Sequence, residues 1–370
     1  NKISSLEPLR GAPLVSLNCT GNPISSLEPL RGMQINILVT EGCPVEDLEP
    51  LRGMPIHLLN VGAGRVVSLE PLRGMPLTFL SCWGNRIENL EPLRGMNALT
   101  WLSLNANRVR DLEPIRGLPL VTVNISGNEI ESLEPMRGMP LNVLHCGDNR
   151  IASVEPLKGM QIKMFSCQGN RLKSIEPLRG LPLASLVCGG NELTSIASFV
   201  KNPPDDFRFD CDTIPTRELE WAREAWSRDF RCADHARNVA VILALRKGDL
   251  KGLRVMAVEY KGHHLLLVPK LMTWDEAEAL CRRLGGHLVT ITTADKNEYL
   301  NRLFSHGAWF WMGLQRREQG FAWVTDEPVD YTNFIDPLQG FKLGPKIFSG
   351  RWTSDDVPNA HNSFMIEWDD

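Results

Sequence analysis

Cysteine, histidine and clustered aspartate are the residue types in this chain that could do chemistry, and their spacing limits what that chemistry is. The nine cysteines include no Cys-x-x-Cys pair and no Cys/His pattern that would ligate zinc. His263 and His264 are adjacent in a strand-like segment, so we expect their side chains to point to opposite faces. No nucleophile elbow, phosphate-binding loop, HExxH or kinase signature occurs. The residues therefore predict that this chain is not an enzyme.

An acidic group lies just after residue 200. Asp205, Asp206, Asp210 and Asp212 could hold a cation, but we interpret them as part of a solvated loop. The net charge of −4 at pH 7 gives no electrostatic case for binding nucleic acid or an anionic membrane. No apolar run approaches the roughly 20 residues needed to span a bilayer.

An internal sequence repeat predicts the secondary-structure elements on which any functional site would lie. The residue before each Glu-Pro pair recurs every 21 residues, with one extra residue between Leu90 and Leu112. The aligned residues are Leu6, Leu27, Leu48, Leu69, Leu90, Leu112, Leu133, Val154 and Ile175. A unit this short cannot bury its own apolar face, so neighbouring units must stack into a solenoid.

Within one unit, Leu77, Leu80 and Cys82 alternate in a strand-like way and should point inward together. Asn85 follows at the turn, where its amide can satisfy the backbone of adjacent turns. The Glu-Pro pair limits helix formation, so we expect the return side to consist of short turns or 3₁₀ segments. Its Glu and Arg residues, such as Glu70 and Arg73, are expected to face outward and pair with one another.

Five cysteines share one repeat position that other units fill with Leu104 or Ile125. They are Cys19, Cys82, Cys146, Cys167 and Cys188. A cysteine that exchanges with leucine and isoleucine behaves as a small buried hydrophobe. We therefore expect reduced thiols, which favours a cytoplasmic location. The redox states of Cys211, Cys232 and Cys281 stay open.

The unit L-x-x-L-x-C/L-x-G-N-x-I-x-S-L-E-P-L-R-G-M-P resembles the leucine-rich repeat, in the short bacterial form also seen in internalins. The resemblance covers about residues 1–200 and implies an α/β solenoid, a horseshoe of 21-residue repeats. Function on such a solenoid belongs to strand positions on the concave side. One such column reads Ser16, Ile37, Leu58, Phe79, Trp101, Thr122, Val143, Met164 and Ser185.

The apolar middle of this column predicts a protein-binding patch. Its candidate partner-binding residues are Leu58, Phe79, Trp83, Trp101 and Val143. Exposed aromatic patches concentrate binding energy at protein interfaces. The alternative is that these side chains pack only on each other along the column.

The repeat pattern stops near residue 196. Residues 201–256 are expected to form a cap and a helical spacer, because the apolar spacing of Leu219, Ala222 and Trp226 is helical. From residue 257 to 370 the sequence resembles the C-type lectin fold, a mixed α+β domain. The resemblance rests on TW-x-x-A-x-x-x-C at 273–281, GGHLVTI at 285–291, WMGL at 311–314, the run beginning WVTDEP at 323, GRW at 350–352 and FMIE at 364–367.

Our expectations about function rest on the positions at which this sequence differs from the C-type lectin pattern. Cys281 stands where the family places the first half of a disulfide, but the expected partner position holds Ile366, which implies a free buried thiol. Sugar-binding members coordinate calcium through a loop triplet and a second acidic pair. In this sequence the candidate calcium ligands at those positions are Asp336, Asp355 and Asp356, which match the family pattern only in part. Three such residues are few, because calcium normally takes six to eight oxygen ligands. We therefore expect no cofactor, with calcium as an open alternative.

We interpret the chain as a bacterial, non-catalytic recognition protein whose repeats and calcium-independent lectin-like domain both bind protein. One alternative is a calcium-dependent lectin that binds glycans, and another is a structural subunit that docks onto sister copies as a homo-oligomer. Proteins with this pair of modules can also carry a protein kinase domain upstream. Because the chain opens inside a repeat without Met, a cell-surface or secreted location also stays open.

Overall fold

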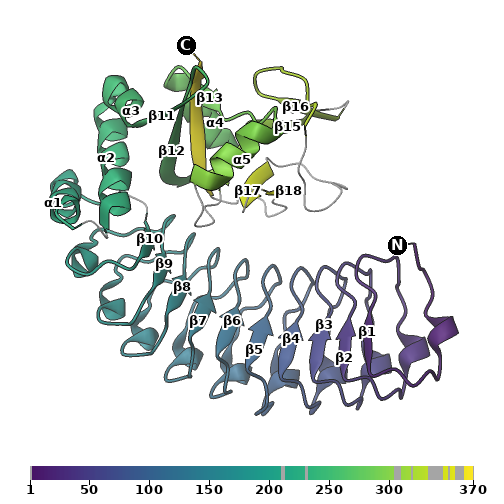
Figure 1. Cartoon of the computed structure of the whole chain (residues 1–370). Helices are drawn as coiled ribbons and strands as arrows, with labels where there is room; N and C mark the ends of the chain where they lie inside the picture. Colours follow the sequence, from purple (N-terminus) through teal and green to yellow (C-terminus); the bar gives the residue numbers. More distant parts are fainter. Residues whose placement is uncertain are drawn as a thin grey trace. The chain divides into compact units, whose positions relative to one another are not determined.

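The computed structural model describes residues 2–209, 213–229, 232–303, 310–317, 320–331, 345–348, 351–354 and 362–369. The chain divides into two compact units, Asn1–Phe207 and Arg208–Asp370. Figure 1 shows the elements of each unit.

The first unit is a solenoid whose strands form one parallel sheet in chain order (Figure 1). The strands are β1 (Ser16–Asn18), β2 (Ile37–Val39), β3 (Leu58–Asn60), β4 (Phe79–Ser81), β5 (Trp101–Ser103), β6 (Thr122–Asn124), β7 (Val143–His145), β8 (Met164–Ser166), β9 (Ser185–Val187) and β10 (Asp206–Arg208). Leu77, Leu80 and Cys82 are fully buried between the layers, as the alternation predicted.

The return side consists of short 3₁₀ helices, which confirms that part of the prediction. They are η1 (Glu7–Leu9), η2 (Glu28–Leu30), η3 (Glu49–Leu51), η4 (Glu70–Leu72), η5 (Glu91–Leu93), η6 (Glu113–Ile115), η7 (Glu134–Met136), η8 (Glu155–Leu157), η9 (Glu176–Leu178) and η10 (Ala197–Phe199). In η1 to η9 the proline occupies the first turn, where its missing N–H costs no hydrogen bond. The glycine that follows, such as Gly74 with φ 71°, then turns the chain back toward the next strand.

Asparagine residues at the turns connect neighbouring repeats by hydrogen bonds. The Oδ1 atom of Asn85 accepts from the Val66 N–H at 2.8 Å, and its Nδ2 atom donates to the Val61 carbonyl at 2.9 Å and to the Cys82 carbonyl at 3.0 Å. This is the backbone role that the sequence predicted for the asparagine column.

The second unit begins with three helices, α1 (Thr216–Ser227), α2 (Ala233–Lys247) and α3 (Leu250–Met256). Helices α2 and α3 contribute Val241, Ala244 and Leu253 to the same hydrophobic core as the large sheet that follows. Within the segment predicted to be helical at residues 201–256, α2 and α3 therefore share the core of the lectin-like fold.

The large sheet has the strand order β11-β12-β19-β14-β17-β18, and β13 also pairs with β19. Its strands are β11 (Val258–Tyr260), β12 (His263–Met272), β13 (His287–Leu288), β14 (Phe310–Trp311), β17 (Pro345–Phe348), β18 (Arg351–Ser354) and β19 (Asn362–Asp369). A separate hairpin joins β15 (Leu314–Arg317) to β16 (Gly320–Trp323), and the helices are α4 (Trp274–Arg283) and α5 (Ala294–Leu303).

Side chains from opposite faces of this sheet enter two hydrophobic clusters. Leu266, Ile366 and Trp368 pack with Cys281 of α4 in one cluster. Leu265 and Met365 pack with Leu300 of α5 in the other. Cys281 is a free, fully buried thiol in the same cluster as Ile366, as the missing disulfide partner implied.

Candidate functional site

The candidate patch on the repeats is built by strand register. Leu58, Phe79 and Trp101 are direct partners on β3, β4 and β5. The rings of Phe79 and Trp101 stack with their centroids 3.9 Å apart and their planes within 8°. Both side chains are half-buried, so each ring covers its neighbour and still presents surface to solvent.

The other two predicted residues lie farther from this stack. Val143 on β7 is separated from Trp101 by Thr122 of β6. Trp83 follows β4, and its indole covers the backbone of Gly62, where any Cβ atom would collide with it. In the repeat region, described from residue 2 onward, no ring contact joins Trp83 to the stacked pair. The aromatic surface therefore consists of a stacked pair and a separate indole.

Charge is distributed unevenly between the two sides of the solenoid. The strands β1 to β9, all of which the structure describes, contain no Asp, Glu, Lys or Arg. Ion pairs outside the strands join neighbouring repeats, such as Arg65 with Glu46 and Arg110 with Glu129. The return turns carry one ion pair each from η1 to η9, as in the 2.7 Å contact between Arg73 Nε and Glu70 Oε1. Each of these pairs lies within one repeat at i,i+3 spacing and is about half exposed, so it contributes little to stability.

The histidine near the middle of the sheet adds no charge at neutral pH. His145 is the partner of Asn124 and Ser166 on the adjacent strands. Burial lowers the pKa of His145 because it disfavours the protonated ring. The strands on either side of the aromatic pair thus carry no charged side chain, and the Glu41 carboxylate beside β3 accepts a hydrogen bond from Asn60 at 2.7 Å.

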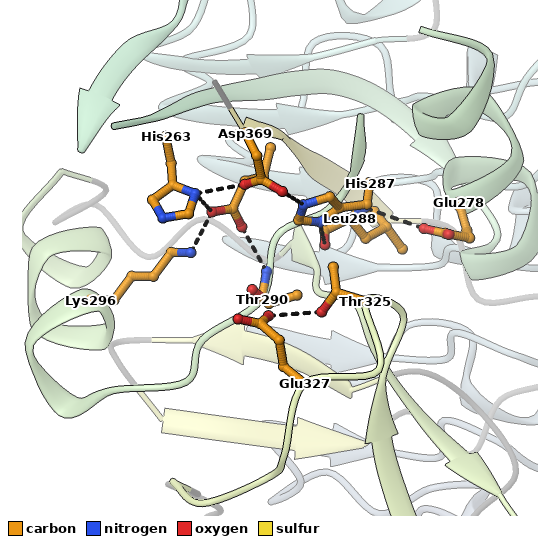
Figure 2. Close-up of polar contacts among 10 residues, drawn as sticks. His263, Glu278, His287, Leu288, Thr290, Lys296, Thr325, Glu327 and Asp369 are labelled. Carbon is orange, nitrogen blue, oxygen red and sulfur yellow. Dashed lines mark hydrogen bonds and ion pairs between the residues drawn. The ribbon is translucent and has the colours of Figure 1, made fainter. Parts of the chain in front are cut away.

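The lectin-like fold contains a polar network that the sequence did not predict (Figure 2). The carboxylate of Glu367 is fully buried, with Oε1 2.5 Å from Lys296 Nζ and Oε2 accepting from the Thr290 N–H at 3.0 Å. Two histidines lie at its edge, His263 on β12 and His287 on β13, and both contact Asp369 on β19. These residues are up to 106 positions apart in the sequence, so spacing alone gave no signal for them.

The two adjacent histidines lie on opposite faces of β12, as predicted, because His263 pairs with Asp369 and His264 with Trp368. Trp311 and Trp323, which begin two of the motifs that resemble the C-type lectin fold, are buried in the core. The candidate calcium ligands Asp336, Asp355 and Asp356, together with Cys211, lie outside the described residues.

No helix among the described residues is long and apolar enough to cross a membrane.

A family model of the lectin C-type domain matches residues 270–361. The chain is 34% identical over 105 residues to the snaclec echicetin subunit alpha of Echis carinatus sochureki, a match that covers 25% of this chain and 78% of that protein. It is 28% identical over 68 residues to the oxidized low-density lipoprotein receptor 1 of Bos taurus, of which it spans only 25%.

Among solved structures, an internalin from Listeria monocytogenes superposes with a TM-score of 0.50 and 19% identity, covering 61% of this chain and 76% of the internalin. That likeness establishes the leucine-rich repeat fold of the N-terminal region. Neither the leucine-rich repeat nor the C-type lectin domain is a catalytic family.

Proposed function

Because the chain belongs to the C-type lectin family through its C-terminal domain and carries internalin-like repeats, we propose that it is a non-catalytic recognition protein. Its principal partner is a protein, bound at the concave strand surface around Phe79 and Trp101. The observation that carries this proposal is the half-exposed stack of these two rings in the middle of strands β1 to β9, which contain no Asp, Glu, Lys or Arg.

A stacked aromatic pair suits an interface for two physical reasons. The rings are already held by each other, so little rotamer freedom is lost when a partner covers them. Large aromatic side chains surrounded by neutral groups are also where interfaces concentrate their binding energy. Leu58 extends the apolar surface on one side, and Val143 adds a smaller apolar group two strands beyond Trp101.

The lectin-like domain supplies a second binding module in this proposal. A calcium-dependent lectin is the competing function, since the family match spans Asp336, Asp355 and Asp356. The described cysteines are buried thiols, which supports a reducing, cytoplasmic compartment. A structural subunit that assembles with sister copies as a homo-oligomer is the other alternative.

The test compares partner capture by three immobilised proteins: the unaltered chain, the Phe79→Ala/Trp101→Ala variant, and a Glu70→Gln/Arg73→Gln control on the return side. Captured proteins are identified by mass spectrometry, and the dissociation constant of the purified partner is then measured by surface plasmon resonance. The aromatic variant should bind at least about thirtyfold more weakly, the effect of losing a hot spot worth 2 kcal/mol.

The control variant should bind as the unaltered chain does. Equal affinity for the aromatic variant would exclude the concave surface as the binding site. Capture that EDTA or free monosaccharides abolish would instead support the lectin alternative.

A further inference from the structure

A second candidate site lies on the large sheet of the lectin-like fold, at the ends of β12 and β19 (Figure 2). His263 is the direct antiparallel partner of Asp369, and His287 on β13 is the direct partner of Glu367. Direct partners project from the same face, so three adjacent strands bring two imidazoles and two carboxylates together. Strand residues are held more precisely than loop residues, because hydrogen bonds fix their register.

The donor atoms of His263, Glu367 and Asp369 all lie within 4.8 Å of one another. His263 Nδ1 is 2.7 Å from Asp369 Oδ1 and 3.0 Å from Glu367 Oε1. One N–H can point well at only one of these oxygens. A metal ion could contact both oxygens and the nitrogen together, since two ligand atoms on tetrahedral zinc lie about 3.3 Å apart at bond lengths near 2 Å. To reach this spacing, the His263 nitrogen would have to move away by about 0.6 Å from the Asp369 oxygen and by about 0.3 Å from the Glu367 oxygen.

His287 is oriented toward the same carboxylate. Its Nδ1 atom lies 2.9 Å from the Leu288 carbonyl, and its Nε2 atom lies 3.2 Å from Asp369 Oδ2. An N–H at Nε2 donates to Asp369 Oδ2 and so holds this carboxylate in place. A carboxylate that ligates a metal is usually oriented by such a hydrogen bond from a neighbouring group.

The local charge also favours a cation. Glu367 and Asp369 bring two negative charges, and the ammonium of Lys296 compensates one of them at Glu367 Oε1, which leaves one net negative charge. Asp369 contacts the imidazole groups of His263 and His287. The side chains of His263 and Asp369 are 39% and 56% exposed, which leaves an entry path and room for water ligands.

We propose that His263, Asp369 and Glu367 form a binding site for a divalent transition-metal ion of the Zn²⁺ type, with His287 supporting the Asp369 carboxylate. Imidazole nitrogen suits zinc, nickel and copper, whereas calcium selects oxygen ligands. The ion would join β12 to the last residues of β19. This site is separate from the concave surface of the repeats, so either proposal can fail alone.

The test is isothermal titration calorimetry with ZnCl₂ on the full chain, freed of any affinity tag and stripped with EDTA. We expect one ion per chain, and a hundredfold excess of CaCl₂ should not displace it. His263→Ala and Asp369→Asn should each weaken the zinc dissociation constant at least tenfold. His264→Ala is the matched control, because this neighbour faces the other side of β12, and its zinc affinity should be unchanged.

Absence of zinc binding by the unaltered chain would overturn the proposal, as would equal zinc affinity in His263→Ala and Asp369→Asn. Circular dichroism checks that each variant is folded. Crystals of the unaltered chain soaked in zinc give an answer that does not depend on any variant. Anomalous density between His263 and Asp369 is expected, and density only elsewhere would refute the assignment.

Discussion

The rings of Phe79 and Trp101 stack face to face across β4 and β5, with centroids 3.9 Å apart. Stacked aromatic pairs contribute about 0.5–1.5 kcal/mol beyond the area that they bury. A double-mutant cycle with Phe79→Leu and Trp101→Leu should therefore give a coupling free energy of about 1 kcal/mol in urea unfolding. Additive effects of the two substitutions would show that the contact does not stabilise the fold.

An uncharged strand surface also predicts how binding depends on salt. Interfaces steered by charge weaken as ionic strength rises, because the Debye length falls from about 10 Å at 0.1 M to about 3 Å at 1 M. The strands β1 to β9 contain no Asp, Glu, Lys or Arg. The dissociation constant of the partner should change less than about threefold between 0.1 and 0.5 M NaCl, as measured by surface plasmon resonance. A tenfold weakening would place charged residues in the interface.

The turn asparagines should carry a large share of the stability of each repeat. Asn85→Ala removes the acceptor of the buried Val66 N–H and the donor to three carbonyls, so we expect the free energy of unfolding to fall by about 2–4 kcal/mol. Asn89 is the matched control, because its side chain accepts one exposed hydrogen bond from the Glu91 N–H in the same repeat. Asn89→Ala should cost about 1 kcal/mol or less. Equal losses would contradict the bridging role of Asn85.

The fold of the repeat region was predictable because the same residue pattern recurs in each 21-residue unit. The alternation of Leu77, Leu80 and Cys82 determined which side chains are buried, and the Glu-Pro pairs determined the 3₁₀ turns. The direction of Trp83 was not predictable, because it depends on the space above Gly62 in the preceding repeat.

The network around Glu367 was missed for a different reason. The pairing of His263 with Asp369 depends on the register of two strands at opposite ends of the domain. A sequence motif covers neighbouring positions and carries no information about such a register. The contribution of Val241 and Leu253 to the lectin-like core likewise depends on tertiary packing.

Thiol reactivity tests the burial of the cysteines. Burial raises the pKa of the Cys19 thiol to about 12, and it also raises the pKa values of Cys82, Cys146 and Cys281. Only the thiolate reacts quickly with iodoacetamide. At pH 8 the native chain should be alkylated at no more than Cys211, whereas all nine cysteines should react in urea, as counted by mass spectrometry. Rapid native labelling of Cys281 would contradict its burial.

The Glu–Arg pairs of the return turns predict how stability depends on pH. The hydrogen bond from Arg73 lowers the pKa of Glu70, and Arg52 and Arg94 do the same for Glu49 and Glu91. A carboxyl whose pKa is lower in the folded chain stabilises it above the ordinary value of 4.5. That stabilisation is lost as the pH falls through the folded-state pKa.

The urea midpoint should therefore fall between pH 6 and pH 3. An Arg52→Gln/Arg73→Gln/Arg94→Gln variant should show a shallower fall, because its carboxyls titrate near their ordinary pKa in both states. The same slope in both proteins would mean that other groups control the acid response.

Calcium binding distinguishes a protein-binding module from a calcium-dependent lectin. A ligand that binds the native state raises stability by about 2.7 kcal/mol at a hundredfold excess over its dissociation constant. Asp336, Asp355 and Asp356 offer three carboxylates where calcium usually takes six to eight oxygens. We therefore expect the unfolding temperature followed by tryptophan fluorescence to be the same in 5 mM CaCl₂ and in EDTA. A rise in calcium that Asp355→Asn/Asp356→Asn abolishes would contradict this expectation. It would make glycan binding through the lectin-like domain the leading function, because the same carboxylates would then hold the ion that sugar hydroxyls coordinate in this family.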